Sequence, residues 1–256
     1  MQDQPAQSST HVEYILRVAD NALILGQRLS EWSGHAPVLE EELALANIAL
    51  DLIGQARLLL THVGTLEGNG RDEDQLAFLR TEHEYRNVTL VELPNGDFGA
   101  TVLRTFLFAA FQFELWQALQ TSSDSTLAAI AGKSLKETRY HLRHSSEWVI
   151  RLGLGTEESH ARMQSALDRL WPYTAELFSD DETDVTAARE MLGPACSSLQ
   201  SAWSAAVLPV LEEAALEVPA STSFRSRGKV GVHSEHLGHV LSEMQYLQRA
   251  YPGATW

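Results

Sequence analysis

Two runs of polar residues, each at helical spacing, are the first features of this sequence that could carry chemistry. Side chains three or four positions apart lie on the same face of a helix, so each run would form a stripe. The stripes are Asn47, Asp51 and Gln55, and Glu137, His141 and His144. Carboxylates and imidazoles that face one another in a helical core can ligate iron, or they can satisfy one another as a hydrogen-bonded network. We expect the two stripes to meet as a buried polar network.

A di-iron carboxylate site requires more than these stripes supply, because it is built from two glutamates and two Glu-x-x-His motifs on four helices. Neither stretch that carries a stripe contains a Glu-x-x-His. Glu137 and His141 are one residue too far apart, and Glu82 and His83 are adjacent. A complete di-iron site is therefore not predicted. A mononuclear site at Glu137, His141 and His144 stays open as the less favoured alternative.

A histidine-rich segment follows near the end of the sequence, and its candidate ligands are His236, His239 and Glu243. These three could share one helical face. However, Ser234 suits a helix N-cap, and Glu235 suits the first turn, where a negative charge is favourable. The segment is interpreted as a helix start whose histidines hydrogen-bond to the preceding loop. Metal binding is the less favoured alternative there as well.

Helices must position these residues, because apolar residues recur at spacings of three and four in almost every segment. The long predicted helices are 10–32, 37–66, 98–120 and 125–152. The last of these is preceded at residues 121–124 by a cluster rich in helix-capping residues. The first places five apolar residues on one face: Tyr14, Val18, Ala22, Leu25 and Leu29. Shorter ones are predicted at 72–87, 157–178, 183–192, 196–217 and 234–251. Four long helices with short connections are typical of a four-helix bundle, around which the later helices would pack. The sequence therefore predicts an all-α fold.

One domain is predicted for all 256 residues, because neither an internal repeat nor a long linker divides the chain. Residues 1–9 are polar and are expected to be disordered. Residues 218–233 lack a helical period and predict a long loop. That loop carries Arg225, Arg227 and Lys229 in an otherwise acidic chain. It is interpreted either as a mobile solvent loop or as a docking surface.

Composition restricts the class of partner and the compartment. The 19 basic and 34 acidic residues give a net charge of −15, which repels nucleic acid and anionic membrane surfaces. The apolar stretch from Leu43 to Leu60 contains polar residues that are costly in hydrocarbon, so a buried helix is favoured over a membrane span. The polar opening MQDQPAQSST predicts no secretory leader, and the single Cys196 excludes an internal disulfide. We expect a cytoplasmic protein with a protein or small-molecule partner.

Four long stretches of the sequence resemble those of a known protein family. They are LGQRLSEWSGHAPVLEEELALANIALDLIGQARLLL, LVELPNGDFGATVLR, KETRYHLRHSSEWVIRLG and VHSEHLGHVLSEMQYLQR. Together they resemble the structural, non-catalytic C-type subunit of the bacterial 1,2-phenylacetyl-CoA epoxidase complex, and the resemblance covers nearly the whole chain. It implies a ferritin-like fold in phenylacetate catabolism.

The resemblance also implies partners. A related catalytic subunit would hold the di-iron centre and epoxidise the ring of coenzyme A-bound phenylacetate. A small bridging subunit would join the complex, and a reductase with flavin and iron-sulfur groups would pass electrons from NADPH, with O2 as co-substrate. This chain would be a component of that multicomponent monooxygenase without being an enzyme alone, and it would hold no cofactor.

The same resemblance implies where metal ligands have been lost. The catalytic relative's first Glu-x-x-His falls on Leu52 and Gln55, where the shared Gly54 directly precedes the histidine position, and its second falls on Thr138 and His141. One histidine thus survives without its glutamate. Leucine cannot coordinate iron, and a threonine hydroxyl is a poor substitute for a carboxylate.

Three functional hypotheses follow. In the first, the chain is a scaffold that binds and stabilises the catalytic subunit. In the second, it also contacts the phosphates of coenzyme A through Arg225, Arg227 and Lys229. In the third, it is a metal-binding oxygenase with a degenerate site. The scaffold hypothesis is preferred because most of the positions that correspond to metal ligands in the catalytic relative carry residues that cannot replace those ligands.

Overall fold

The computed structural model describes residues 5–254, and within them the chain is helical, so the predicted all-α class is confirmed. In this range the pairing of extended backbone is limited to an isolated bridge between Arg227 and Val232. The α-helices are α1 Pro5–Ser30, α2 Leu39–Glu67, α3 Glu73–Phe78, α4 Thr89–Glu92, α5 Phe98–Leu119, α6 Ser125–Gly153, α7 Glu157–Leu170, α8 Glu182–Arg189, α9 Gln200–Glu213 and α10 Glu235–Ala250. Shorter 3-10 helices are Glu82–Glu84, Trp171–Phe178, Cys196–Leu199 and Gly228–Val230.

The helices group into two compact units. The first holds the residues up to Pro94 and those from Arg227 onward, and the second holds Asn95–Ser226. The predicted single-domain organisation stays a prediction. Of residues 1–9, which were expected to be disordered, residues 1–4 lie outside the described range, and residues 5–9 belong to α1.

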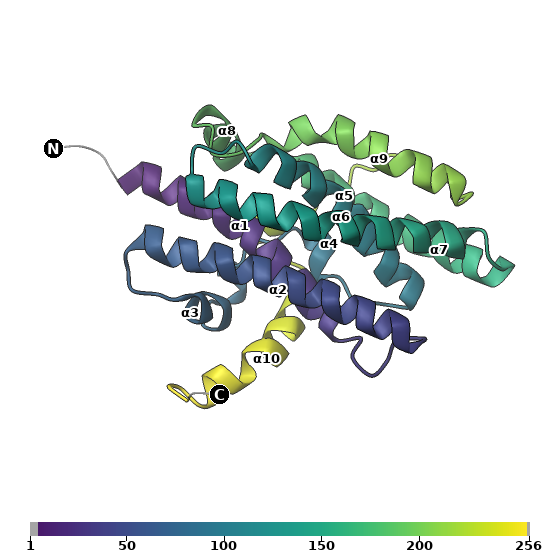
Figure 1. Cartoon of the computed structure of the whole chain (residues 1–256), viewed down its shortest axis with the longest axis horizontal. Helices are drawn as coiled ribbons and strands as arrows, with labels where there is room; N and C mark the ends of the chain where they lie inside the picture. Colours follow the sequence, from purple (N-terminus) through teal and green to yellow (C-terminus); the bar gives the residue numbers. More distant parts are fainter. Residues whose placement is uncertain (1–4, 255–256) are drawn as a thin grey trace. The chain divides into compact units, whose positions relative to one another are not determined.

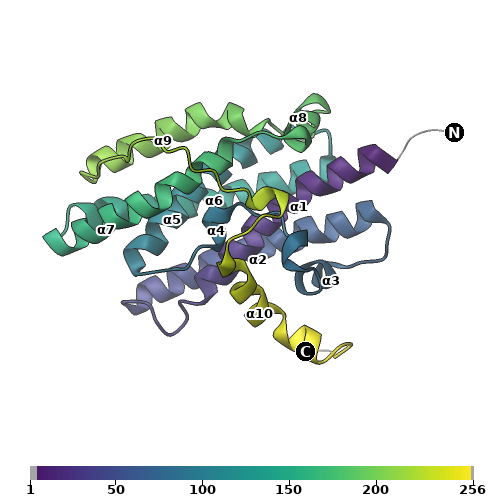
Figure 2. The ribbon, with the colours of Figure 1, turned by 180° about the vertical axis from the view of Figure 1, so that it is seen from behind.

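The first unit is built on α1 and α2, which run antiparallel (Figure 1). The predicted core face of α1 is confirmed, because every member is buried: Tyr14, Val18, Ala22, Leu25 and Leu29. Gly26 lets the pair approach, since a Cβ there would lie 3.0 Å from Ile53 Cγ1. On the other side of the unit, α10 packs against α3 and α4 (Figure 2).

The second unit is built on α5 and α6, again antiparallel (Figure 1), with α7 and α9 packed against them. Two aspartates cap the long helices. Asp97 accepts from the Ala100 N–H at 2.8 Å, and Asp124 accepts from the N–H groups of Thr126 and Leu127. The capping cluster predicted before residue 125 is therefore confirmed. Two antiparallel pairs of long helices, one in each unit, are the elements that a ferritin-like bundle uses.

Two of the long helices, α2 and α5, are long and apolar enough to cross a membrane by length and composition alone. They differ in burial. In its most apolar window α5 is 78% buried inside the protein, as the core helix of a unit should be, whereas α2 is only 50% buried. The expected buried helix at Leu43–Leu60 is therefore buried on one side and exposed on the other.

Candidate functional site

The polar stripe of α2 winds around the helix rather than following one face. Asn47 is exposed, Asp51 is half-buried and Gln55 is buried. An α-helix turns about 100° per residue, so each step of four residues advances the side chain by about 40°. Over the eight residues from Asn47 to Gln55 this drift carries the stripe from the outside to the inside. The predicted burial is therefore wrong for Asn47.

The buried polar face of α6 also differs from the predicted one. Its members are Ser134, Thr138, His141 and Ser145, spaced by four, three and four residues. Glu137 and His144 are only half-buried and lie on the flank. Glu137 pairs with the exposed Lys133 at 3.8 Å, and the His144 ring stacks on Tyr140 with centroids 5.7 Å apart.

The sequence did not single out Ser134 and Ser145, because a serine inside a helix has no distinctive pattern. The spacing of this buried face is the signal that could have found them. Of the three residues of the less favoured mononuclear site, His141 is buried and Glu137 and His144 are half-buried, and that site stays an alternative. That the stripes of α2 and α6 meet stays a prediction.

The four positions that the resemblance identifies as former ligand positions are all buried, and they carry little ligand chemistry. Leu52 presents hydrocarbon and Gln55 an amide on α2, while Thr138 presents a hydroxyl and His141 an imidazole on α6. Of these groups, imidazole is the one that iron readily takes, and carboxylate is missing altogether. These residues do not fit the donor set of a di-iron carboxylate centre.

Two hydroxyls on the buried face of α6 are enclosed without a hydrogen-bond partner among the described residues. They are Ser134 Oγ and Thr138 Oγ1. By contrast, Ser145 Oγ donates to the His141 carbonyl oxygen at 2.7 Å. A buried hydroxyl without a partner costs free energy relative to the unfolded chain, where water satisfies it. The Thr138 hydroxyl is thus poorly satisfied in one of the positions that the resemblance identifies as a degenerate ligand position.

We expect Thr138→Val to raise the free energy of unfolding of the chain by about 1 kcal/mol, because it removes an unpaired buried hydroxyl at nearly constant volume. The matched control is Ser145→Ala, which removes a hydrogen-bonded hydroxyl from the same face and should lower that free energy by a similar amount. Urea denaturation followed by circular dichroism measures both. Equal losses in the two variants would mean that Thr138 Oγ1 has a partner in solution.

One Glu-x-x-His does occur in the chain, outside the two stripes, and the prediction that a complete di-iron site is absent did not take it into account. It joins Glu157 to His160 in the first turn of α7. Glu157 is exposed, and His160 Nδ1 lies 2.9 Å from the Gly153 carbonyl oxygen. A histidine that donates to the end of the preceding helix and a glutamate in the first turn both serve helix termini. This motif is explained by capping.

The predicted cationic cluster in the 218–233 segment does not form one surface. Arg225 and Arg227 are exposed, but Lys229 is buried. The reason is close packing at Gly228, where a Cβ would lie 2.4 Å from the Asn87 carbonyl oxygen. This contact presses the short 3-10 helix into the first unit and takes Lys229 inside. Arg225 donates to the Thr222 carbonyl oxygen at 2.7 Å.

His233, which precedes the candidate ligands His236, His239 and Glu243, is the histidine that holds the C-terminal segment in place through hydrogen bonds. Its Nδ1 lies 2.8 Å from Glu92 Oε2, and its Nε2 lies 3.0 Å from the Tyr85 carbonyl oxygen. Glu92 also accepts from the Ser234 N–H at 2.6 Å and from Asn87 Nδ2 at 2.7 Å. The side chains of His233 and Glu92 are both buried. This network fastens the start of α10 to α4.

The predicted start of α10 is confirmed, because Ser234 Oγ accepts from the His236 N–H at 3.3 Å. His239 and Glu243 are exposed on this helix, and His236 is half-buried. Their side chains project from a surface helix, so the structure favours the helix-start interpretation over a metal site.

A second buried charge network joins α1 to the segment after α3. Arg80 forms a two-pronged ion pair with Asp20, one prong being Nη1 to Oδ2 at 2.9 Å, and both side chains are almost completely enclosed. Burial alone would lower the pKa of Arg80, but the charge and hydrogen bonds of Asp20 outweigh it and raise that pKa above its ordinary value. Burial also raises the pKa of Tyr85, whose ring lies under the Arg80 guanidinium.

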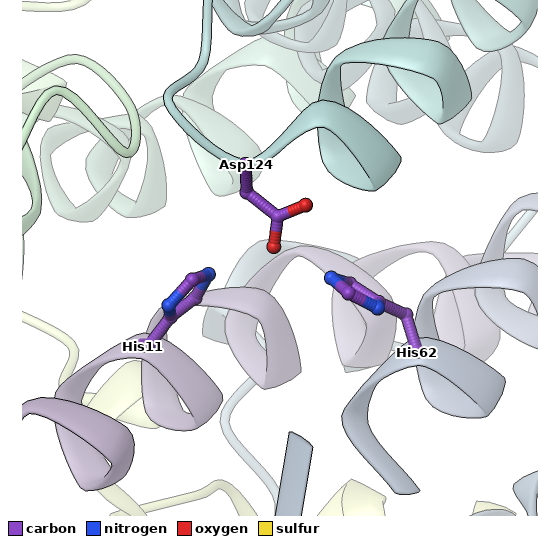
Figure 3. A group of neighbouring side chains, drawn as sticks. All are labelled: His11, His62 and Asp124. Carbon is purple, nitrogen blue, oxygen red and sulfur yellow. The ribbon is translucent and has the colours of Figure 1, made fainter. Parts of the chain in front are cut away.

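Two further groups of potential ligands are present. His11 on α1 and His62 on α2 point toward one another within the first unit, with ring nitrogens within 4.8 Å (Figure 3, which also draws Asp124 of the second unit). Two imidazoles fall short of the three or four protein ligands of a zinc site. In the second unit, Cys196 Sγ lies 3.5 Å from Asp184, and Asp180 accepts from the Ser197 N–H. Asp184 lies on α8 and also accepts from the Asp181 N–H at 3.1 Å, so both acids already serve hydrogen bonds of neighbouring helix ends.

Comparison with known proteins gives a consistent result. The family model described as phenylacetic acid catabolic protein matches residues 1–256. A relative from Escherichia coli (strain K12), described as the C subunit of 1,2-phenylacetyl-CoA epoxidase, is 50% identical over 243 residues, which cover 95% of this chain and 98% of the relative. The resemblance noted in the sequence is thereby confirmed. The chain belongs to the phenylacetic acid catabolic protein family.

Proposed function

We propose that this chain is the C-type subunit of a phenylacetyl-CoA 1,2-epoxidase and that its role in the complex is structural. It binds the di-iron catalytic subunit and stabilises the conformation in which that subunit oxidises its substrate. The named relative supports membership of such a complex, since it is described as one of its subunits. The chain works in the cytoplasm as part of phenylacetate catabolism.

The observation that carries the structural role is the chemistry of the former ligand positions. Leu52, Gln55 and Thr138 are buried and offer no carboxylate or imidazole, and only His141 retains a ligand group. A di-iron centre needs four carboxylates and two histidines. The chain therefore keeps the helices of a di-iron protein, but side chains that pack in the core occupy most of the positions where metal ligands would be. It holds no cofactor of its own.

The proposal places the remaining components in other chains. The di-iron centre belongs to the catalytic subunit, and flavin, iron-sulfur groups and NADPH belong to the reductase. The assembly also includes a small bridging subunit. Contact with the coenzyme A substrate is not adopted as a second function, because the burial of Lys229 breaks up the cationic cluster on which it depended. The hypothesis that this chain is a metal-binding oxygenase in its own right is not adopted either, because most of its ligand positions carry residues that cannot bind iron.

Co-expression tests the structural role directly. The catalytic subunit expressed without this chain is expected to be largely insoluble or to lose at least about 100-fold of its turnover, because an obligate apolar interface would be left exposed. Adding this chain should restore soluble, active protein. Full solubility and full turnover of the catalytic subunit alone would refute the proposal.

A matched variant separates a scaffold from a metalloenzyme. His141→Ala in this chain should leave the turnover of the complex within about 3-fold and its iron content at about two atoms per catalytic subunit. The matching histidine of the catalytic subunit, replaced in the same way, should abolish both. Loss of iron from the His141→Ala complex would instead assign a metal to this chain.

A further inference from the structure

Two of the five asparagines in this chain, Asn69 and Asn95, are directly followed by glycine. An asparagine in this position can lose its side-chain amide, because the main-chain nitrogen of the next residue can reach the side-chain carbonyl carbon. Glycine favours that approach, since it has no Cβ to obstruct it and its backbone adopts many conformations. The reaction requires the asparagine side chain and the backbone to rotate, so the folded structure decides which of the two can react.

Asn69 lies in the short connection between α2 and α3 (Figure 1). It is exposed, and so are its neighbours Gly68 and Gly70. Both glycines have a positive φ, 64° and 73°, and a Cβ at either would meet nothing within 4 Å. Within residues 5–254, neither the Asn69 side chain nor the Gly70 N–H has a hydrogen-bond partner. The amide and the nitrogen that would attack it are therefore both accessible and unrestrained.

The hydrogen bonds that hold this connection lie before and after Asn69. The Gly68 N–H donates to the Gly64 carbonyl oxygen at 3.3 Å, which closes α2. The Arg71 side chain donates to both carboxylate oxygens of Glu67, at 2.9 and 2.6 Å. None of these bonds involves the groups that would react, so the reaction does not have to break them.

Asn95 has the same following residue but is held in place. Its side-chain oxygen accepts from Nη2 of Arg104, a residue that is 1% exposed. Its carbonyl oxygen accepts from Thr101 Oγ1 at 3.0 Å. Gly96 is restrained as well, since a Cβ there would lie 3.1 Å from Arg169 Nη2. Ring closure at Asn95 would require its side chain and backbone to rotate against these contacts.

We propose that Asn69 is a deamidation site of the folded chain and that the fold protects Asn95. The Gly70 nitrogen forms a bond to Asn69 Cγ while the bond from Cγ to the side-chain nitrogen breaks, and that nitrogen leaves as ammonia with the proton of the Gly70 N–H. Water then adds to either carbonyl carbon of the succinimide ring, which opens to an aspartyl or an isoaspartyl residue. Water is the co-reactant, and no electrons are transferred. This inference does not rest on the proposed function.

The product changes the charge of the connection and, in the isoaspartyl form, the length of its main chain. A neutral amide becomes a carboxylate in a chain whose net charge is already −15. In the isoaspartyl form the main chain runs through the former side chain and gains a carbon atom. The connection packs closely on α2 just after this point, because a Cβ at Gly64 would lie 2.2 Å from the Arg71 carbonyl oxygen. The longer main chain should loosen that contact and raise hydrogen exchange in α3.

Incubation of the full chain in warm, mildly alkaline buffer, followed by tryptic digestion and mass spectrometry, tests the inference. The tryptic peptide 58–71 contains Asn69 as its sole asparagine. It should gain the mass that replacement of NH2 by OH produces, and chromatography should separate the aspartyl and isoaspartyl forms. Asn95, followed by fragmentation of the peptide 87–104, should convert at least about 10-fold more slowly, because hydrogen bonds must break there before the ring can close.

The unfolded chain is the matched control, because Asn69 and Asn95 have the same following residue. In concentrated urea the protection of Asn95 is lost, and the two asparagines should convert at rates within about 3-fold of each other. Asn69→Gln is the matched variant. It keeps an exposed amide but lengthens the side chain by a methylene group, which disfavours ring closure, and it should show no mass gain in the peptide 58–71.

Each other outcome decides against the proposal. Equal rates at Asn69 and Asn95 in the folded chain would show that the fold protects neither of them. If Asn69 reacts in urea but not in the folded chain, the connection between α2 and α3 holds the amide out of reach and the site is overturned. A mass gain in the peptide 58–71 of Asn69→Gln that equals the wild-type gain would place the reaction at another residue.

Discussion

Asp20→Ala is expected to lower the free energy of unfolding of this chain by about 3–5 kcal/mol, the largest effect of any single substitution argued from the structure. Asp20 is the counter-ion of Arg80, and both side chains are buried, with exposed fractions of 0% and 3%. The carboxylate also accepts from the Arg86 N–H at 2.8 Å. Its removal leaves a buried guanidinium without its counter-charge, and the group cannot escape by losing its proton, because a guanidinium stays protonated in proteins.

Guanidinium chloride unfolding of the full chain measures the loss, and a double-mutant cycle with Arg80→Ala isolates the pair. The double variant should lose clearly less than the sum of the two single losses, because it leaves no unpaired charge of this pair inside. The surface pair of Arg57 and Glu73 is the matched control. Arg57 is 73% exposed, so Glu73→Ala should cost less than about 1 kcal/mol. A similarly small loss for Asp20→Ala would contradict the buried pair.

The existence of the long helices could be predicted from the sequence because it depends on local information. Apolar residues at spacings of three and four define the core face of α1, and every residue predicted for that face is buried. The boundaries of the shorter elements could not be predicted. The helix expected at 72–87 ends at Phe78, because Arg80 turns inward to Asp20 and a new capping box begins between Thr81 and Glu84.

The helix expected at 157–178 shows the same limit. It is α-helical only to Leu170 and continues as a 3-10 helix from Trp171, where Pro172 occupies the first turn. The helix expected at 196–217 begins as a 3-10 helix and ends at Glu213. Proline and tertiary contacts decide these changes, and a pattern of apolar spacing contains neither kind of information.

The candidate site was predictable in part. The resemblance alone identified Leu52, Gln55, Thr138 and His141 as degenerate ligand positions, and all four are buried. Which side of each polar stripe points inward was not predictable, because the drift of about 40° per four residues separates Asn47 from Gln55. Contacts between residues far apart in the sequence leave no local pattern at all, and both buried charge networks of the first unit are of this kind.

The network around Glu92 illustrates what such a long-range contact does. Glu92 and His233 are 141 residues apart, and a half-buried loop leads from His233 into α10. Both ring nitrogens of His233 face acceptors, a carboxylate and the Tyr85 carbonyl oxygen, so both bonds form only when each nitrogen carries a proton. The carboxylate of Glu92 thus lies against the His233 ring and also accepts from the Ser234 N–H and Asn87 Nδ2.

Glu92→Gln is therefore expected to lower the free energy of unfolding by about 3 kcal/mol, although the side chain keeps its size. An amide has one acceptor oxygen in place of two, and its NH2 group would face another donor, either the Ser234 N–H or His233. Hydrogen exchange should rise at residues 232–240, because the start of α10 loses its attachment to α4. Glu235→Gln, the same change on the exposed first turn of α10, should cost less than about 1 kcal/mol and leave exchange at α4 unchanged. If Glu92→Gln and Glu235→Gln behave alike, the carboxylate does not hold the C-terminal helix in place.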